Sequence, residues 1–303
     1  MSYLKRNIKY RNIKIYARTS NVIFTLFDTF ITPRAGEISV RGLMQLLKPL
    51  GFSENAIRLV LSRMARHGYV RGSRRGRLSY YSLTTKGNIV VQSGKKHTGT
   101  VEKRAWDNTW YCVVYTVPEQ KRYVRDSLRA VLKGLGYGNL GGLWISPYGF
   151  TNILAERIKK LNAQEYIETF RAHYTGSLNL PKLAARIWDI KGLETRYGSF
   201  IKKYHAKYDA YKEQITSGDR LKPDFCFAER FRVMTEYIDI VLDDPMLPKE
   251  MLHTRWTGSK AKKLTDDLKT LLTARADEYV SMVMQQELLR SKKVRRKIPT
   301  VDR

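Results

Sequence analysis

Residues 53–83 of the chain read SENAIRLVLSRMARHGYVRGSRRGRLSYYSL. Ser53 is a residue type that caps helices, and an apolar pattern with helical spacing follows it until Gly68. Two β-prone segments then flank a glycine-bounded turn at 72–77, which predicts a hairpin. A helix followed at once by a basic hairpin is typical of the second half of a winged helix-turn-helix, so the first half is expected upstream.

Two shorter helices are predicted before this stretch. The first starts at Ser20 and is closed by Pro33, and the second is capped by Ser39 and ends at Pro49. Each of the three helices has one apolar stripe, so the three can share one small core. The stripes are Ile23, Leu26, Phe27 and Phe30; Val40, Leu43, Met44 and Leu47; and Ile57, Val60, Leu61 and Met64.

Charge points to a polyanionic partner. Lys and Arg number 56 against 28 Asp and Glu, a net charge of +28. Residues 1–105 carry 21 basic and 4 acidic residues, so the surplus is concentrated in the N-terminal third. Such a surplus attracts nucleic acid or an anionic membrane. A basic protein adapted for solubility is the alternative, but the tight clustering of the arginines favours DNA.

The third helix has an outward face suited to the major groove. Arginine can bind guanine O6 and N7 together, Asn55 can pair with adenine, and Leu59 can touch a thymine methyl. Ser53 and the helix N-terminus can hold a phosphate. An ordinary solvated helix is the alternative, although such a surface usually mixes charges of both signs. The predicted contacts on this helix are Ser53, Asn55, Arg58, Leu59, Ser62, Arg63 and Arg66.

The hairpin adds a second set of cations. Glycines at 72 and 76 are expected to let its backbone turn tightly and approach a phosphate. Wing arginines usually contact phosphate or the minor groove, which positions the protein without reading sequence. A solvated hairpin tip is the alternative. The predicted wing contacts are Arg71, Arg74, Arg75 and Arg77.

The rest of the chain predicts a small α/β domain and then a helical one. The pattern strand, helix, strand, helix, strand indicates a ferredoxin-like sandwich. Its elements are expected at Trp110–Val117, Glu119–Leu135, Gly142–Ser146, Asn152–Leu161 and Glu165–His173. From Leu183 to about Leu289 the pattern is helical, with a loop at Asp243–Pro248.

The fold class is therefore an α+β multidomain protein. We predict six segments: a basic arm at 1–18, a winged helix at 19–92, a linker at 93–105, a ferredoxin-like domain at 106–176, a helical domain at 183–290 and a basic tail at 291–303. Two distant cysteines make no disulfide framework, and no apolar run is long enough to span a membrane. A cytoplasmic protein without membrane attachment is expected.

Motifs for catalysis are weak. The strand at Trp110–Val117 contains no acid, and its flanking acids, Asp107 and Glu119, have no convincing partner for holding a metal ion. The glycine-rich run at 134–142 lacks the Lys-Ser/Thr of a phosphate-binding loop, and a turn from helix to strand explains it better. We predict neither an enzyme nor a cofactor. A protein that organises DNA without sequence preference stays an alternative. The charge favours it, although the large helical half of the chain argues against it.

Several short stretches along the chain form a recognisable series of motifs. They are residues 27–30 (FDTF), 34–38 (RAGEI), 50–58 (LGFSENAIR), 61–64 (LSRM), 80–87 (YYSLTTKG), 106–110 (WDNTW) and 244–252 (DPMLPKEML), with Trp256, Gly258 and Ala261 after them. In this order they resemble the PaaX family, the repressors of bacterial phenylacetate degradation. The resemblance covers nearly the whole chain, which makes it more specific than a winged helix alone.

The resemblance implies an N-terminal winged helix, a middle domain like that of the CRISPR-associated Cas2 proteins and a helical C-terminal domain. It also implies a homodimer on a partly palindromic double-stranded DNA operator, released by an aryl-CoA thioester such as phenylacetyl-CoA. A Cas2-like domain raises the alternative of a metal-dependent nuclease, which the acid-free strand disfavours. Candidate effector residues are Trp188, Tyr197 and Trp256 for stacking on a ring, with Arg230 and Arg232 for charge; core aromatics and surface arginines are the alternative.

Overall fold

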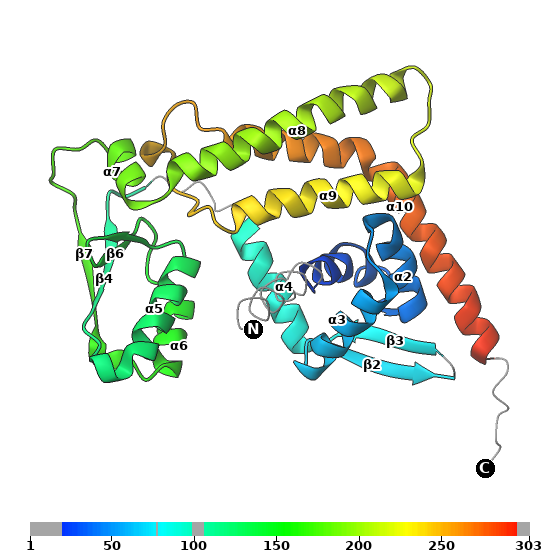
Figure 1. Cartoon of the computed structure of the whole chain (residues 1–303), viewed down its shortest axis with the longest axis horizontal. Coiled ribbons are helices and arrows are strands. Elements are labelled where there is room, and N and C mark those ends of the chain that lie inside the picture. The colour runs from blue at the N-terminus through cyan, green and yellow to red at the C-terminus, as the bar shows by residue number, and fades with distance from the viewer. Residues whose placement is uncertain (1–19, 77, 99–105, 296–303) are drawn as a thin grey trace, which may run out of the picture. The chain divides into compact units, whose positions relative to one another are not determined.

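The computed structural model describes residues 20–76, 78–98 and 106–295 (Figure 1). The chain divides into two compact units. Unit 1 comprises Met1–Lys96, Lys207–Thr235 and Thr265–Arg303, and unit 2 comprises His97–Ala206 and Glu236–Leu264. Three helices contribute residues to both units, so the helical segment at 183–290 is divided between them. These are α8 (Ile190–Thr216), α9 (Pro223–Val241) and α10 (Gly258–Arg295).

Unit 1 begins with a helix over residues 20–26 that continues as a π-helical turn, η1 (Phe27–Ile31). The next elements are β1 (Glu37–Ser39), α2 (Val40–Leu47), η2 (Lys48–Leu50), α3 (Glu54–Arg66), β2 (Val70–Arg75), β3 (Leu78–Leu83) and α4 (Thr85–Thr98). The two predicted caps are confirmed. Ser39 Oγ accepts from the Gly42 N–H at 3.0 Å, and Ser53 Oγ accepts from the Ala56 N–H at 3.3 Å.

The predicted apolar stripes form the core of unit 1. All their members are buried except Val40 and Met44, which are half-buried. The same core contains Phe227 and Phe231 from α9 and Val280 from α10. The C-terminal helices and the N-terminal elements therefore stabilise one another by burying a shared apolar surface.

The hairpin of unit 1 is longer than the sequence predicts. The sheet has the order β1-β3-β2, and the register pairs Arg75 with Leu78, which leaves a turn of two residues. Gly76 adopts a positive φ of 59°, as such a turn requires. Gly72, expected in the turn, instead lies in β2 opposite Tyr81. Cross-strand pairing along six residues outweighs the poor strand propensity of this segment.

Unit 2 contains a four-stranded antiparallel sheet with the order β5-β6-β4-β7. This is the strand order of the expected ferredoxin-like type. Helices α5 and α6 lie on one face of it (Figure 1) and pack on Val113 and Trp144. The elements are β4 (Trp110–Tyr115), α5 (Arg122–Gly134), β5 (Gly138–Leu140), β6 (Leu143–Ser146), α6 (Asn152–Lys160) and β7 (Ile167–Ala172).

The opposite face of this sheet is covered as well. Trp110, Cys112 and Ile145 pack there against Leu183 of α7 (Leu180–Ile187) and Met251 of η5 (Lys249–Met251). Short 3-10 turns precede α5 and β7, η3 (Glu119–Lys121) and η4 (Gln164–Tyr166). Burial on both faces explains why β4 reads as a nearly continuous apolar run.

Two boundaries and one strand differ from the predictions. Residues 93–98, expected in a linker, continue α4, and residues 291–295, expected in the tail, continue α10. Strand β5 forms within the glycine run that was read as a turn. A Cβ at Gly138 would lie 2.2 Å from Ile187 Cγ2, so glycine there permits close packing of the strand. The basic arm at 1–18, the linker at 99–105 and the tail at 296–303 lie outside the described residues.

Candidate nucleic-acid interface

Helix α3 presents a cationic face to solvent. Arg58 and Arg66 are exposed, and Leu59 is 53% exposed on the same side. The opposite face is the buried stripe from Ile57 to Met64, which fixes the rotation of the helix. The one acid of α3, Glu54, lies in its first turn. The remaining predicted contacts on the helix, Asn55 and Ser62, are exposed and Arg63 is half-buried.

Ser53 has a defined structural role at the start of α3. Its hydroxyl oxygen accepts the Ala56 N–H, as an N-cap does. The hydroxyl proton is the donor that the cap leaves available for a phosphate. The cap thus orients the first turn of the helix and leaves the hydroxyl free to donate one hydrogen bond.

The hairpin arginines fall into two kinds. Arg71 and Arg74 are exposed, and Arg74 Nε donates to the Gly76 carbonyl at 3.2 Å. Arg75 is half-buried and bound to Glu37 of β1 through two hydrogen bonds, 2.5 Å from Nη1 to Oε1 and 2.9 Å from Nη2 to Oε2. The pair joins β2 to β1 across the sheet and balances the charge of Arg75, whose contact with DNA stays a prediction. Arg77 lies outside the described residues.

Residues that anchor the end of α3 were missed by the sequence reasoning. Lys86 Nζ donates to the His67 carbonyl at 2.8 Å, and Thr84 Oγ1 donates to the Gly68 carbonyl at 2.6 Å. Gly87 packs directly on Tyr69, because a Cβ there would lie 2.2 Å from the Tyr69 carbonyl oxygen. These contacts fix the base of the hairpin against α3. In the sequence these residues belong to the TTKG motif at 84–87, which did not indicate their contacts with the end of α3.

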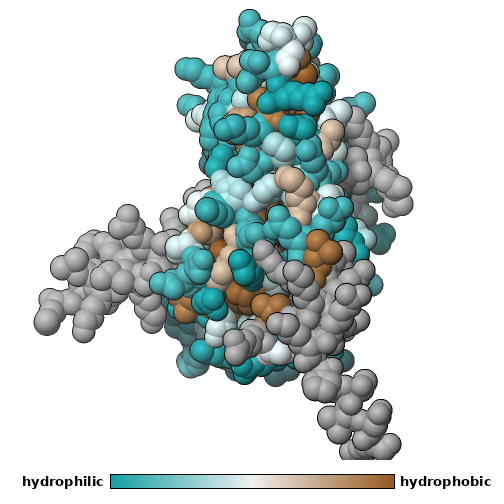
Figure 2. Space-filling view, turned by 90° about the vertical axis from the view of Figure 1, so that its right-hand side faces the viewer, coloured by the Kyte–Doolittle hydropathy of each residue, from teal (hydrophilic) through white to brown (hydrophobic). Residues whose placement is uncertain are grey.

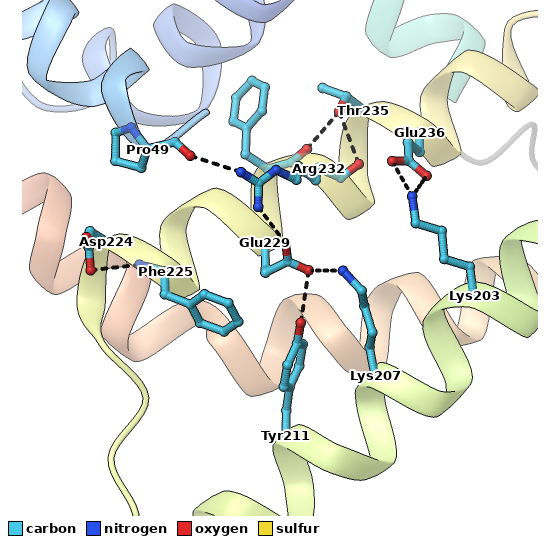
Figure 3. A network of polar contacts seen from close by, with 11 residues as sticks. Pro49, Lys203, Lys207, Tyr211, Asp224, Phe225, Glu229, Arg232, Thr235 and Glu236 are labelled. Atoms are coloured by element: carbon cyan, nitrogen blue, oxygen red, sulfur yellow. Dashed lines mark hydrogen bonds and ion pairs between the residues drawn. The ribbon is translucent and has the colours of Figure 1, made fainter. Parts of the chain in front are cut away.

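A buried carboxylate holds the turn that precedes α3 (Figure 3). Glu229 of α9, whose side chain is 4% exposed, accepts from Lys207 Nζ at 2.7 Å, Tyr211 OH at 3.0 Å and Arg232 Nη1 at 2.6 Å. Arg232 Nη2 also donates to the Pro49 carbonyl of η2 at 3.0 Å. Burial alone would raise the pKa of Glu229, but these hydrogen bonds together lower it below its ordinary value.

Helix α10 contacts the same region. Tyr279 OH donates to the Gln45 carbonyl of α2 at 2.7 Å. Asp277 binds Arg34 at 3.5 Å and the buried Arg230 at 3.3 Å. Burial lowers the pKa of Arg230, and its guanidinium lies over the Phe30 ring at 5.3 Å. The C-terminal helices in unit 1 therefore set the positions of α2 and α3.

The five candidate effector residues are not gathered into one site within a unit. Arg230 and Arg232 make the unit 1 contacts described above. In unit 2, Trp188 stacks on Trp110 at 6.2 Å and donates to the Gly136 carbonyl. Tyr197 OH donates to Asp244 at 2.7 Å and its ring meets Trp256 edge-on at 5.7 Å. Each has a structural partner, and their role in effector binding stays a prediction.

The acids that flank β4 also have local partners. Asp107 Oδ1 accepts the Thr109 N–H at 2.9 Å, and Glu119 pairs with Arg125 at 2.8 Å. In the described part of the chain, no three His, Cys, Asp or Glu side chains group as metal ligands.

No helix among the described residues is long and apolar enough to cross a membrane. The face seen in Figure 2 is largely hydrophilic, with apolar side chains in small separate groups.

Comparison with known families matches three models in succession. A PaaX-like protein model matches residues 18–87, the PaaX protein central Cas2-like domain matches 103–184, and the PaaX-like protein C-terminal domain matches 188–282. The chain belongs to the PaaX family. This agrees with the resemblance seen in the sequence motifs.

Individual relatives extend the family match. The chain is 27% identical over 288 residues to the transcriptional repressor PaaX of Escherichia coli (strain K12). The alignment covers 93% of this chain and 89% of that protein. The solved structure of the uncharacterized protein Rv0674 from Mycobacterium tuberculosis superposes with a TM-score of 0.56 at 20% identity. It covers 86% of this chain and 97% of that chain, and it supports the fold of this PaaX-family member.

Proposed function

We propose that this PaaX-family chain is a transcriptional repressor that binds double-stranded DNA through a winged helix-turn-helix. In this proposal α2, the turn at η2 and α3 are the helix-turn-helix, and β2 and β3 are the wing. The observation that carries it is the solvent face of α3, on which exposed arginines stand opposite a fully buried stripe. A recognition helix needs such a rigid, cationic and acid-poor face to enter the major groove.

The two elements are given different tasks. Arg58 and Arg66, with Asn55, are proposed to reach base edges, because guanidinium and amide groups match the hydrogen-bonding patterns of guanine and adenine. Arg71 and Arg74 of the wing are proposed to contact phosphates or the minor groove. Because the E. coli relative is named a repressor, we assign repression to this chain as well.

The proposal includes a homodimer and an effector. Two copies of α3 enter major grooves about 34 Å apart, or a multiple of that distance, on a partly palindromic operator. Phenylacetyl-CoA or another aryl-CoA thioester releases the DNA. Family membership supports both statements, and the contacts of α9 with η2 and of α10 with α2 give an effector a physical route to α3.

A mobility shift on the intergenic DNA upstream of the coding sequence tests the proposal. We expect a specific complex that survives competitor DNA and dissociates on addition of phenylacetyl-CoA. A specific complex that ignores the thioester would keep the repressor and remove this effector. Binding without preference over competitor would contradict the repressor itself.

The net charge of +28 favours one alternative, a protein that binds DNA without sequence preference. The two functions differ in their response to salt and sequence. Non-specific binding falls steeply with salt on every sequence alike, whereas a repressor retains a preference of roughly 10³ or more for its operator at physiological salt. Titrations of operator and random DNA at two salt concentrations separate them.

A further inference from the structure

A pocket in unit 2 is not accounted for by DNA binding. Its volume is about 690 Å³, within the range of small-molecule sites. It lies between α5 and the helix-covered face of the sheet. Its lining residues are Tyr115, Thr116, Val117, Arg125, Arg129, Asn139, Gly142 and Trp144.

The floor of the pocket is aromatic. Asn139 and Trp144 are direct partners across β5 and β6, and Trp144 is paired with Val113 on the other side. Tyr115 lies two residues beyond Val113 on β4, so its side chain is on the same face of the sheet. Two aromatic residues and an amide therefore lie side by side on one face, which suits a flat ring with polar edges.

The wall of the pocket is cationic. Arg125 and Arg129 are one turn apart on α5, and no acid is among the lining residues. Arg129 is exposed, its Nε donates to Tyr115 OH at 3.0 Å, and in the described chain no carboxylate lies within 4 Å of its guanidinium. The Nη groups of Arg129 are thus available to an incoming anion.

Arg125 is held ready beside it. Its two Nη groups donate to the carboxylate of Glu119 at 2.8 and 3.4 Å from outside the lining, which fixes the guanidinium and leaves Nε as its remaining donor. Its Nε–H is buried without a hydrogen-bond partner among the described residues. A buried donor left unpaired is destabilising, so a ligand acceptor that reached it would be favoured.

We propose that this pocket binds a phosphorylated small molecule with a flat ring, the chemistry of a nucleotide. The phosphate lies between Arg125 and Arg129, and the ring lies over Tyr115 and Trp144 with its edge toward Asn139. Guanidinium groups bind phosphate through paired, charge-assisted hydrogen bonds, which a neutral ligand of the same size does not form.

The inference deepens the proposed function without depending on it. CoA thioesters contain a phosphorylated adenosine, so the pocket is a candidate site for the nucleotide part of the effector. A free nucleotide has the same chemistry. Titration with CoA and with ADP separates the two sources. Binding of both ligands indicates the nucleotide part of a CoA effector, and binding of ADP without CoA indicates a free nucleotide.

Isothermal titration of the full-length protein with ADP, CoA and inorganic phosphate tests the site. We compare the wild type with Arg129→Glu and with Arg157→Glu, the same change at an exposed residue of α6 that does not line the pocket. We expect Arg129→Glu to weaken ADP binding about tenfold or more, and Arg157→Glu to change it less than twofold. Inorganic phosphate, which lacks the ring, binds at least tenfold more weakly than ADP. Thermal melts of both variants check that they fold.

The outcomes are separable from those of the DNA experiment. Binding of ADP lost in Arg129→Glu alone supports the pocket, whether or not any thioester releases DNA. Absence of ADP and CoA binding, equal effects of the two variants, or phosphate binding as tightly as ADP each overturns it. A failed mobility shift with intact ADP binding refutes the repressor and keeps the nucleotide site.

Discussion

The substitution Glu229→Gln tests whether the C-terminal helices stabilise the predicted DNA-binding elements. Glutamine has nearly the same shape but no charge, so Lys207 and Arg232 lose the anion that they share. Because Glu229 is 4% exposed, water does not replace that anion fully. Neutralising one partner of a buried ion pair costs about 3–5 kcal/mol when the charge left behind is also buried. We expect the lower end, about 3 kcal/mol, because Lys207 and Arg232 are 37% and 43% exposed and glutamine still accepts a hydrogen bond.

Helix α9 provides a matched control. Glu236, seven residues further on, also binds a lysine of α8, with both of its oxygens 2.8 Å from Lys203 Nζ (Figure 3). That pair is exposed, with side chains 37% and 48% accessible. Exposed pairs contribute roughly 0–1 kcal/mol, so Glu236→Gln is expected to change stability little. The two variants thus make the same chemical change in different surroundings.

Thermal melting by circular dichroism measures the difference. A loss of about 3 kcal/mol corresponds to a Tm lower by roughly 6–12 °C for a unit of this size. The effect depends on pH because the folded-state pKa of Glu229 is lowered. The stability that such a carboxylate contributes is present above its ordinary pKa of 4.5 and is lost as the pH falls through the folded-state pKa. The Tm values of the wild type and Glu229→Gln therefore converge in acid. Equal melting of Glu229→Gln and Glu236→Gln at neutral pH would refute the reasoning.

Three further predictions concern the interface. Arg66→Ala removes an exposed guanidinium from α3, and we expect about tenfold less preference for operator over random DNA in a competition mobility shift; equal losses on both would exclude base reading. Arg71→Ala removes a wing cation, so it should weaken both DNAs alike and reduce the salt slope by about 1, and an unchanged slope would remove the wing from the contacts. Gly87→Ala forces a Cβ toward the Tyr69 carbonyl and should cost about 1–3 kcal/mol in thermal melts, whereas Gly198→Ala in α8, which meets nothing within 4 Å, should stabilise by about 0.5–1 kcal/mol; a neutral Gly87→Ala would contradict the packing.

Local signals predicted unit 1 well where they were strong. The serine caps at 39 and 53 and the stripe from Ile57 to Met64 depend on neighbours within one helix, so sequence spacing specifies them. In unit 2 the alternation of strands and helices predicted β4, α5, β6, α6 and β7, but not the edge strand β5. The exposure of Arg58 and Arg66 followed from the burial of the opposite face.

Long-range partners were not predictable in this way. Nothing near Arg75 in the sequence indicates Glu37, which is 38 residues away, and nothing near Arg232 indicates Pro49. Strand β5 was not predicted because its one glycine, Gly138, permits close packing on Trp188, a residue about fifty positions further on. Such contacts depend on which surfaces meet after folding, and side-chain type alone does not encode them.

The placement of Arg232 changes how an effector has to be considered. The sequence suggested this residue as a ligand contact, yet it joins the buried Glu229 to the turn before α3. A ligand shifts an equilibrium only by binding two states with different affinity, so the proposed release of DNA requires two states that differ in how α3 is held. Helix α9 is continuous from Pro223 to Val241 and contributes residues to both units, with Arg232 near the point of division. Under the proposed function, a displacement of this helix would change the Arg232–Pro49 hydrogen bond, so the bond is a candidate for transmitting the signal to the turn before α3. A direct contact of Arg232 with the ligand stays a prediction.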